Sequence, residues 1–183
     1  ARQFAIYNDT IYIADTYNQR IKVLDLNGGC VWNKPTWGPW GWWPHAIAVG
    51  SSYVYVGHTN GYVSMYSTNG VHQVNNHYNS YIGYAFGMSL NSAGNKLLIG
   101  NYNGNRVVEF NLSGQSITYQ QTSNHAYSSS NGYFRHPTDT GYDSSGNIYA
   151  LDLDNHRIQK FNSGLAYQAK TGSYSVSSGF RYP

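Results

Sequence analysis

The chain has 183 residues and a formal net charge of +3; charged residues make up 10% of it and aromatic residues 16%. Few charges and many aromatic rings argue against intrinsic disorder, because apolar burial can offset the ordering entropy. Lys and Arg form no run, which argues against a nucleic-acid surface. No apolar stretch reaches the roughly 20 residues that cross a bilayer, so membrane insertion is not expected. Abundant Tyr, Val, Asn and Gly favour strands and turns, so the composition predicts an all-β fold.

Four segments of the chain are related to one another. The first is IYIADTYNQRIKVL (11–24), and the last is IYALDLDNHRIQKF (148–161), with Asp, Asn, Arg and Ile at identical spacing. A third copy is LLIGNYNGNRVVEF (97–110), and a weaker one is YVYVGHTNGYVSMY (53–66). Each is an apolar run, a polar turn and a second alternating run, which predicts a β-hairpin.

Further strands are expected around these hairpins. The turns NSAGN (91–95) and DSSGN (143–147) precede two of the hairpins, and each hairpin is followed by room for a fourth strand. Four short strands at a spacing of roughly 40–50 residues are typical of a β-propeller blade. We therefore predict one β-propeller domain over residues 1–183, with blades at about 1–36, 37–80, 81–131 and 132–178, and with 179–183 leading into a seam with residue 1.

The strings IYIADTYNQRIKVLDLNG and GYFRHPTDTGYDSSGNIYALDLDNHRIQKFNSG resemble NHL repeats. That family's consensus begins with aromatic-x-x-Pro, continues with a D-x-x-N-x-R-[IV] hairpin and ends in Gly. The resemblance is strong in the first and fourth units, fair in the third and poor in the second, where Tyr62 replaces the Arg. It implies a propeller in which the repeated charged residues tie hairpins together and pack between blades, an architectural role. These residues are Asp15, Arg20, Arg106, Asp152 and Arg157.

The chain contains a whole number of blades. Its last residues, GFRYP (179–183), repeat GYFRHP (132–137), so a following blade would begin in phase with Ala1. Three arrangements fit this phase: a closed four-bladed ring, four blades of a larger ring, or one period of a tandem array. An isolated open fan would leave strand edges and blade faces bare, which sheets avoid.

The strongest candidate for recognition is a tryptophan-rich segment between the first two blades. Indole faces on a loop can stack on a glycan or anchor a protein interface, or they can plug the end of the ring. The candidate ligand or interface residues are Trp37, Trp40, Trp42 and Trp43.

The sequence carries no recognisable catalytic or metal-binding pattern. The seven histidines lack the spacing of a metal site, and there is no G-x-S-x-G or phosphate loop, so we expect no catalytic residue, metal or cofactor. Cys30 is the lone cysteine, which predicts a small buried apolar residue. Asn8 and Asn111 begin N-x-Ser/Thr sequons and are candidate glycosylation sites. With the low charge, they favour an extracellular or cell-surface location.

These observations predict a non-catalytic interaction or assembly module that binds protein, glycan or copies of itself, including a repeating subunit of a fibre or tandem array. Two alternatives come from the family resemblance, since NHL-like propellers include amidating lyases and RNA-binding domains. One is a metal-dependent lyase or hydrolase with an axial site. The other is an RNA-binding NHL domain, although few charges are available to contact phosphates.

Overall fold

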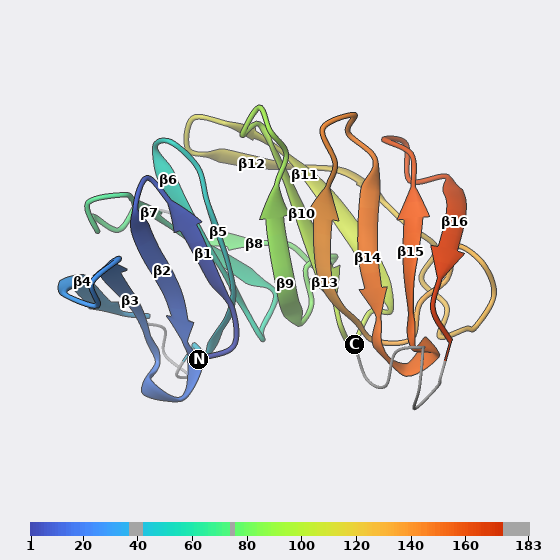
Figure 1. Ribbon diagram of the computed structural model, residues 1–183, viewed down its shortest axis with the longest axis horizontal. Coiled ribbons are helices and arrows are strands. Elements are labelled where there is room, and N and C mark those ends of the chain that lie inside the picture. Colours follow the sequence, from blue (N-terminus) through green and yellow to red (C-terminus); the bar gives the residue numbers. More distant parts are fainter. Residues whose placement is uncertain (37–41, 74–75, 174–183) are drawn as a thin grey trace.

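The computed structural model describes residues 1–36, 42–73 and 76–173. Within them the chain forms four antiparallel sheets of four strands, and in each sheet the strands are neighbours in chain order (Figure 1). Each sheet is therefore a meander built by successive hairpins. The all-β propeller predicted from the repeats is confirmed.

Each blade contributes four strands. The first blade consists of β1 (Phe4–Tyr7), β2 (Thr10–Asp15), β3 (Arg20–Asp25) and β4 (Cys30–Pro35). The second consists of β5 (Pro44–Val49), β6 (Tyr53–His58), β7 (Tyr62–Ser67) and β8 (His77–Tyr78). The third consists of β9 (Ala85–Leu90), β10 (Lys96–Asn101), β11 (Arg106–Ser113) and β12 (Ser116–Thr122). The fourth consists of β13 (Pro137–Tyr142), β14 (Ile148–Asp152), β15 (Arg157–Phe161) and β16 (Tyr167–Thr171).

The turn between the second and third strands follows from the repeated motif. In the first and fourth blades it is a short 3-10 turn, η1 (Thr16–Asn18) or η2 (Leu153–Asn155), followed by a left-handed residue, Gln19 or His156. The motif Asp accepts hydrogen bonds from the motif Asn and Arg, as Asp15 does from Asn18 (2.9 Å) and Arg20 (2.7 Å). These bonds close the turn, so the repeated spacing within the chain has a local structural cause. We call this end of the molecule the hairpin end.

Each blade has a rear face toward the preceding blade and a forward face toward the next. Three apolar clusters fill the three interfaces between successive blades. The cluster between the first and second blades shows the pattern. It joins forward residues Tyr12, Ala14, Ile21 and Val23 to rear residues Ile47, Val54, Val56 and Tyr66.

The blades are arranged as an open arc. Figure 1 shows the first and fourth blades on opposite sides, with the second and third behind them. The innermost strands β1, β5, β9 and β13 follow one another along the inside of the arc. Of the three arrangements that the sequence left open, the described residues therefore do not form the closed ring. The predicted seam at 179–183 lies outside the described residues.

Gln3 links the inner strands of all four blades. Its Nε2 donates to Asp139 Oδ1 (3.1 Å) and to the Met88 carbonyl (3.3 Å), and its Oε1 accepts from the Ile47 amide (2.8 Å). A side chain just before β1 thus reaches β5, β9 and β13. Burial raises the pKa of Asp139, which the Thr140 amide partly counteracts.

One residue-level prediction was wrong. Cys30, expected to be buried, is exposed. It begins β4, which is the outermost strand of the first sheet and pairs on one side with β3. A position at the free edge of a blade leaves the thiol without a second strand to cover it.

Candidate functional site

The four candidate tryptophans divide into two groups. Trp37 and Trp40 lie outside the described residues. Trp42 is 7% exposed, stacks on Tyr62 with ring centroids 4.4 Å apart, and its carbonyl accepts a hydrogen bond from Thr36 (2.8 Å). This indole therefore packs inside the second blade.

Trp43 has a different environment. It is 45% exposed and lies 6.2 Å, centroid to centroid, from Tyr17, which is 72% exposed. Tyr17 belongs to η1, so this aromatic pair lies at the hairpin end and joins the first blade to the second. Two large, exposed rings side by side form an apolar surface with little conformational freedom to lose.

A second aromatic group, which no sequence pattern indicated, continues across the hairpin end. Six rings follow one another with centroids 4.2–5.8 Å apart, and we call this group the aromatic ladder. Its members, in spatial order, are His45, Tyr84, Phe86, Tyr102, His136 and Tyr127. They come from the second, third and fourth blades. The closest pair is Tyr102 and His136, whose rings are 4.2 Å apart and nearly parallel.

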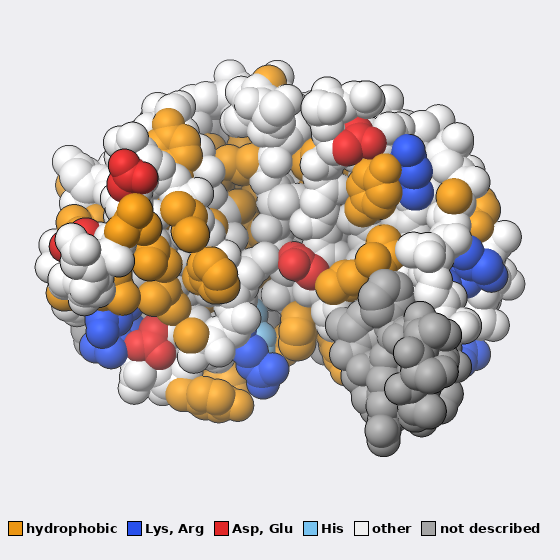
Figure 2. Space-filling model, viewed as in Figure 1, with side chains coloured by type: hydrophobic (Ala, Val, Ile, Leu, Met, Phe, Trp, Pro, Cys, Tyr) orange, Lys and Arg blue, Asp and Glu red, His pale blue; other side chains and the backbone are white. Residues whose placement is uncertain are grey.

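Charged side chains flank the ladder. The Arg2 guanidinium lies 5.7 Å from the Phe86 ring centre, and Arg135 lies 4.9 Å from that of Tyr127. Asp154 accepts a hydrogen bond from Tyr127 (3.1 Å) and pairs with His136 Nδ1 (2.7 Å). Figure 2 shows histidine and Lys or Arg side chains in the hollow between the two halves of the arc.

His45 is the buried end of the ladder. It is 2% exposed, and its Nε2 is 3.2 Å from the Tyr84 hydroxyl. Burial lowers the pKa of His45 to about 4, and the positive charge of Arg2 acts in the same direction. The imidazole is therefore neutral at pH 7, which suits stacking and hydrogen bonding rather than anion binding.

The repeated charged residues lie within their own hairpins. Arg157 Nε donates to Asp152 (2.7 Å), and both side chains are buried, while the same pair in the first blade, Arg20 with Asp15, is part-exposed. In the third blade Asn101 stands where the motif Asp would be, and Arg106 instead lies 4.9 Å from the Tyr81 ring centre. These motif residues are separate from the six rings of the aromatic ladder.

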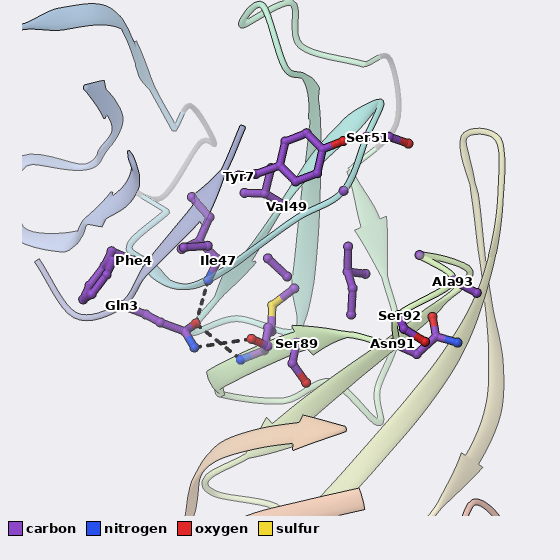
Figure 3. A pocket seen from close by; sticks show the side chains of 16 residues that line it. Gln3, Phe4, Tyr7, Ile47, Val49, Ser51, Ser89, Asn91, Ser92 and Ala93 are labelled. Atoms are coloured by element: carbon purple, nitrogen blue, oxygen red, sulfur yellow. Dashed lines mark hydrogen bonds between the residues drawn. The ribbon is translucent and has the colours of Figure 1, made fainter. Parts of the chain in front are cut away.

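The opposite end of the arc holds a cavity of about 430 Å³ (Figure 3). Its walls are the inner strands β1, β5 and β9 and the turns after β5 and β9, and Gln3 lies at one side with its hydrogen bonds to Ile47 and Met88. The labelled polar side chains Ser51, Asn91 and Ser92 line its wall. Among the described residues that line the cavity, Tyr7 is the one ionisable group.

Neither a metal cluster nor a membrane helix occurs in the described ranges. Within 1–36, 42–73 and 76–173, no three His, Cys, Asp or Glu side chains lie close enough to hold a metal ion. In that part of the chain, no helix has the length and apolarity needed to cross a membrane.

The two sequons have different surroundings. Asn8 is exposed in the β1–β2 turn with φ 48°, and its carbonyl accepts a hydrogen bond from Thr10. Asn111 lies within β11, where its Nδ2 donates to Gln120 (2.6 Å). The Asn8 side chain is therefore the more accessible of the two.

Part of the fourth blade matches a known repeat family. Residues 134–161 match the NHL repeat family model. No curated protein sequence matches the chain.

Solved structures resemble almost the whole chain. A streptogramin B lyase matches with a TM-score of 0.70 and 12% identity, and virginiamycin B lyase from Staphylococcus aureus with 0.66 and 12%; each match covers 96% of this chain and 55% of the other. A protein of unknown function from Bacteroides caccae matches with a TM-score of 0.63 and 10% identity, over 93% of this chain and 62% of the other. The chain thus spans a little over half the length of these proteins. Its described residues form a four-bladed β-propeller arc, and residues 134–161 of the fourth blade match the NHL repeat family model.

Proposed function

We propose that the chain is a non-catalytic interaction module that binds a protein or glycan at the hairpin end. The observation that carries the proposal is the aromatic surface there: the exposed pair Tyr17 and Trp43, and the aromatic ladder that ends at exposed Tyr127. Rigid aromatic rings supply large contact areas at low entropic cost and are enriched where binding energy concentrates. Low overall charge favours the same function, because few ions need to be desolvated.

The proposal is tested with two defined probe sets, a glycan array and a displayed random-peptide library. We expect binders in at least one set whose affinity falls about tenfold or more in Trp43→Ala or Tyr127→Ala, as removal of an interface anchor commonly does. Val71→Ser is the matched control, because Val71 is an exposed apolar residue outside both aromatic groups. Absence of binders in both sets, or binding unaffected by either aromatic variant, would reject this surface.

The lyase alternative has one supporting observation. At the hairpin end, the His45 imidazole lies 3.2 Å from the Tyr84 hydroxyl, and both residue types serve as general acids and bases, although burial and the charge of Arg2 make His45 a weaker base than a free imidazole. Two proteins with the same fold are described as lyases of virginiamycin B or streptogramin B. Incubating the chain with virginiamycin B, with and without added divalent metal, tests this function. Turnover lost in His45→Ala would favour it, and no turnover in either condition would reject it.

An extracellular or cell-surface location is part of the proposal. Its support is the low charge and the exposed sequon at Asn8. On secretion from a eukaryotic host, we expect peptide mass spectrometry to find glycan on Asn8 and little on Asn111, whose amide is engaged within a strand. Failure of the chain to be secreted in folded form would count against this location.

A further inference from the structure

The first and fourth blades each have one outer face whose residues correspond to those buried between blades inside the arc. The pairing of the second and third strands follows the same pattern in every blade. Each position on the rear face of one blade therefore has an equivalent position in the other three. The rear positions Ile11 and Leu24 of the first blade correspond to three buried pairs. These are Val54 with Tyr66, Leu97 with Phe110, and Ile148 with Phe161.

The rear face of the first blade has no described blade in front of it. Phe4 is 64% exposed and Ile6 60%, and they pair with Ile13 and Ile11 on the same side of the sheet. In the second blade the residue equivalent to Phe4 is Ile47, which is 1% exposed inside a blade interface. The first blade therefore exposes a surface of the kind that every later blade buries.

The forward face of the fourth blade is its counterpart. Its four central residues occupy the positions that in the first blade are Tyr12, Ala14, Ile21 and Val23, the forward half of a blade interface. Those fourth-blade residues are Tyr149, Leu151, Ile158 and Lys160. All four are partly exposed, and the Lys160 ammonium lies 5.4 Å from the Tyr149 ring centre.

Both faces look toward the same side of the molecule. Figure 2 shows hydrophobic side chains over the first blade on the left and over the fourth blade on the right, with the hollow between them. A second copy turned by a half rotation would bring its fourth blade to the first blade here, and its first blade to the fourth. The contact joins two unlike faces, a rear face and a forward face. The two-fold rotation produces this contact twice, so the two copies form a closed ring.

We propose that the rear face of the first blade binds the forward face of the fourth blade of a second copy, so that two arcs close into one ring. This pairing goes beyond the binding proposed at the hairpin end, and it gives a specific form to the self-association that the sequence predicts. The occupant follows from the chain itself, because the same two kinds of face already pack against each other at three interfaces within it. Each dimer contains the contact twice.

Sedimentation velocity on the 183-residue chain over a range of concentrations tests the proposal. We expect a species of twice the 20.5 kDa chain mass. Ile6→Lys on the rear face and Ile158→Lys on the forward face should each shift the dimer to monomer, because each places a charge in both contacts. Val71→Lys is the control, since Val71 is 59% exposed and belongs to neither face. Circular dichroism melts verify that every variant is folded.

Mixing the two variants distinguishes unlike faces from like ones. An Ile6→Lys copy keeps its fourth-blade face, and an Ile158→Lys copy keeps its first-blade face, so a mixed pair retains one intact contact. We expect dimer to reappear on mixing although each variant alone is monomeric. A contact between two first-blade faces would not be restored in this way.

Salt provides an independent readout. Each free face carries a lysine, Lys22 on the rear and Lys160 on the forward face, so the approach of two copies brings like charges together. Dimer formation should strengthen as salt rises from about 0.05 to 0.5 M, where screening is nearly complete. A folded chain that stays monomeric, or one that forms open polymers, overturns the proposal. The binding proposed for the aromatic surface is measured separately with Trp43→Ala and Tyr127→Ala, so either proposal can fail alone.

Discussion

At the scale of single residues, the two motif ion pairs differ in burial. Arg157 donates to Asp152 and to the carbonyls of Ser129, Ser130 and Tyr133, whereas the side chain of Arg20 is 37% exposed. Arg157→Ala should lower the free energy of unfolding by about 3–5 kcal/mol, because it leaves a buried carboxylate unpaired. Arg20→Ala should cost about 0–1 kcal/mol.

Urea unfolding of both variants measures this difference. Equal losses of unfolding free energy in the two variants would contradict the assignment of the Arg157–Asp152 pair as the buried one.

The motif spacing predicted both pairs, but their burial could not be read from it. The carbonyls that surround Arg157 come from a serine-rich segment 24 to 28 residues earlier, whose composition indicates a solvated loop.

His58 gives a residue-scale prediction about pH. It is fully buried, its Nε2 contacts Ser64 Oγ (2.8 Å), and burial lowers its pKa to about 3. Because the unfolded chain takes up this proton near the ordinary value of 6.5, stability should fall as pH drops from 6.5 toward 3. His45, with a pKa of about 4, adds to the same trend.

The midpoint of urea unfolding, measured between about pH 6.5 and 4.5, reports this effect. Most carboxyl groups stay ionised in that range, so they contribute little to the change. His58→Gln should flatten the pH dependence, while substitution of the exposed His125 should leave it unchanged. A pH dependence of equal slope in both variants would show that His58 is not the group responsible.

At the scale of elements, the close approach of β9 to β13 depends on a glycine. A Cβ on Gly87 would lie 2.5 Å from the Thr138 carbonyl oxygen and 2.6 Å from Asp139 Cα, both backbone atoms. Gly87→Ala should therefore push the third and fourth blades apart and cost about 1–3 kcal/mol. At Gly141, which lies on β13, a Cβ would meet nothing within 4 Å, so Gly141→Ala should change stability by less than about 0.5 kcal/mol.

Thermal or urea unfolding of these two variants compares the same chemical change in a closed and an open place. If neither substitution changes stability, the inner strands do not pack as described.

The hairpins around these strands were predicted from the period-two pattern and the turn residues. The aromatic ladder was not, because its rings come from several separate segments that meet only when three blades stack. Aromatic residues near the start of each inner strand, such as Tyr84 and Phe86, were the available signal.

At the scale of the whole molecule, the repeat phase predicted four blades, and the described residues form four sheets in chain order. Whether the arc closes could not be predicted from sequence, because apolar alternation along β2 is the same on a free face as on a covered one. The exposed Phe4 and Ile6 identify the free face only once the blades are assembled.

A crystal structure of the purified chain tests most directly that related segments stack face to face as radial blades. We predict four consecutive four-stranded meanders around a common inside edge, with Tyr12, Tyr55 and Leu98 each enclosed between one blade and the next. Two flat sheets packed as a sandwich, or those three side chains at the surface, would contradict the propeller arrangement.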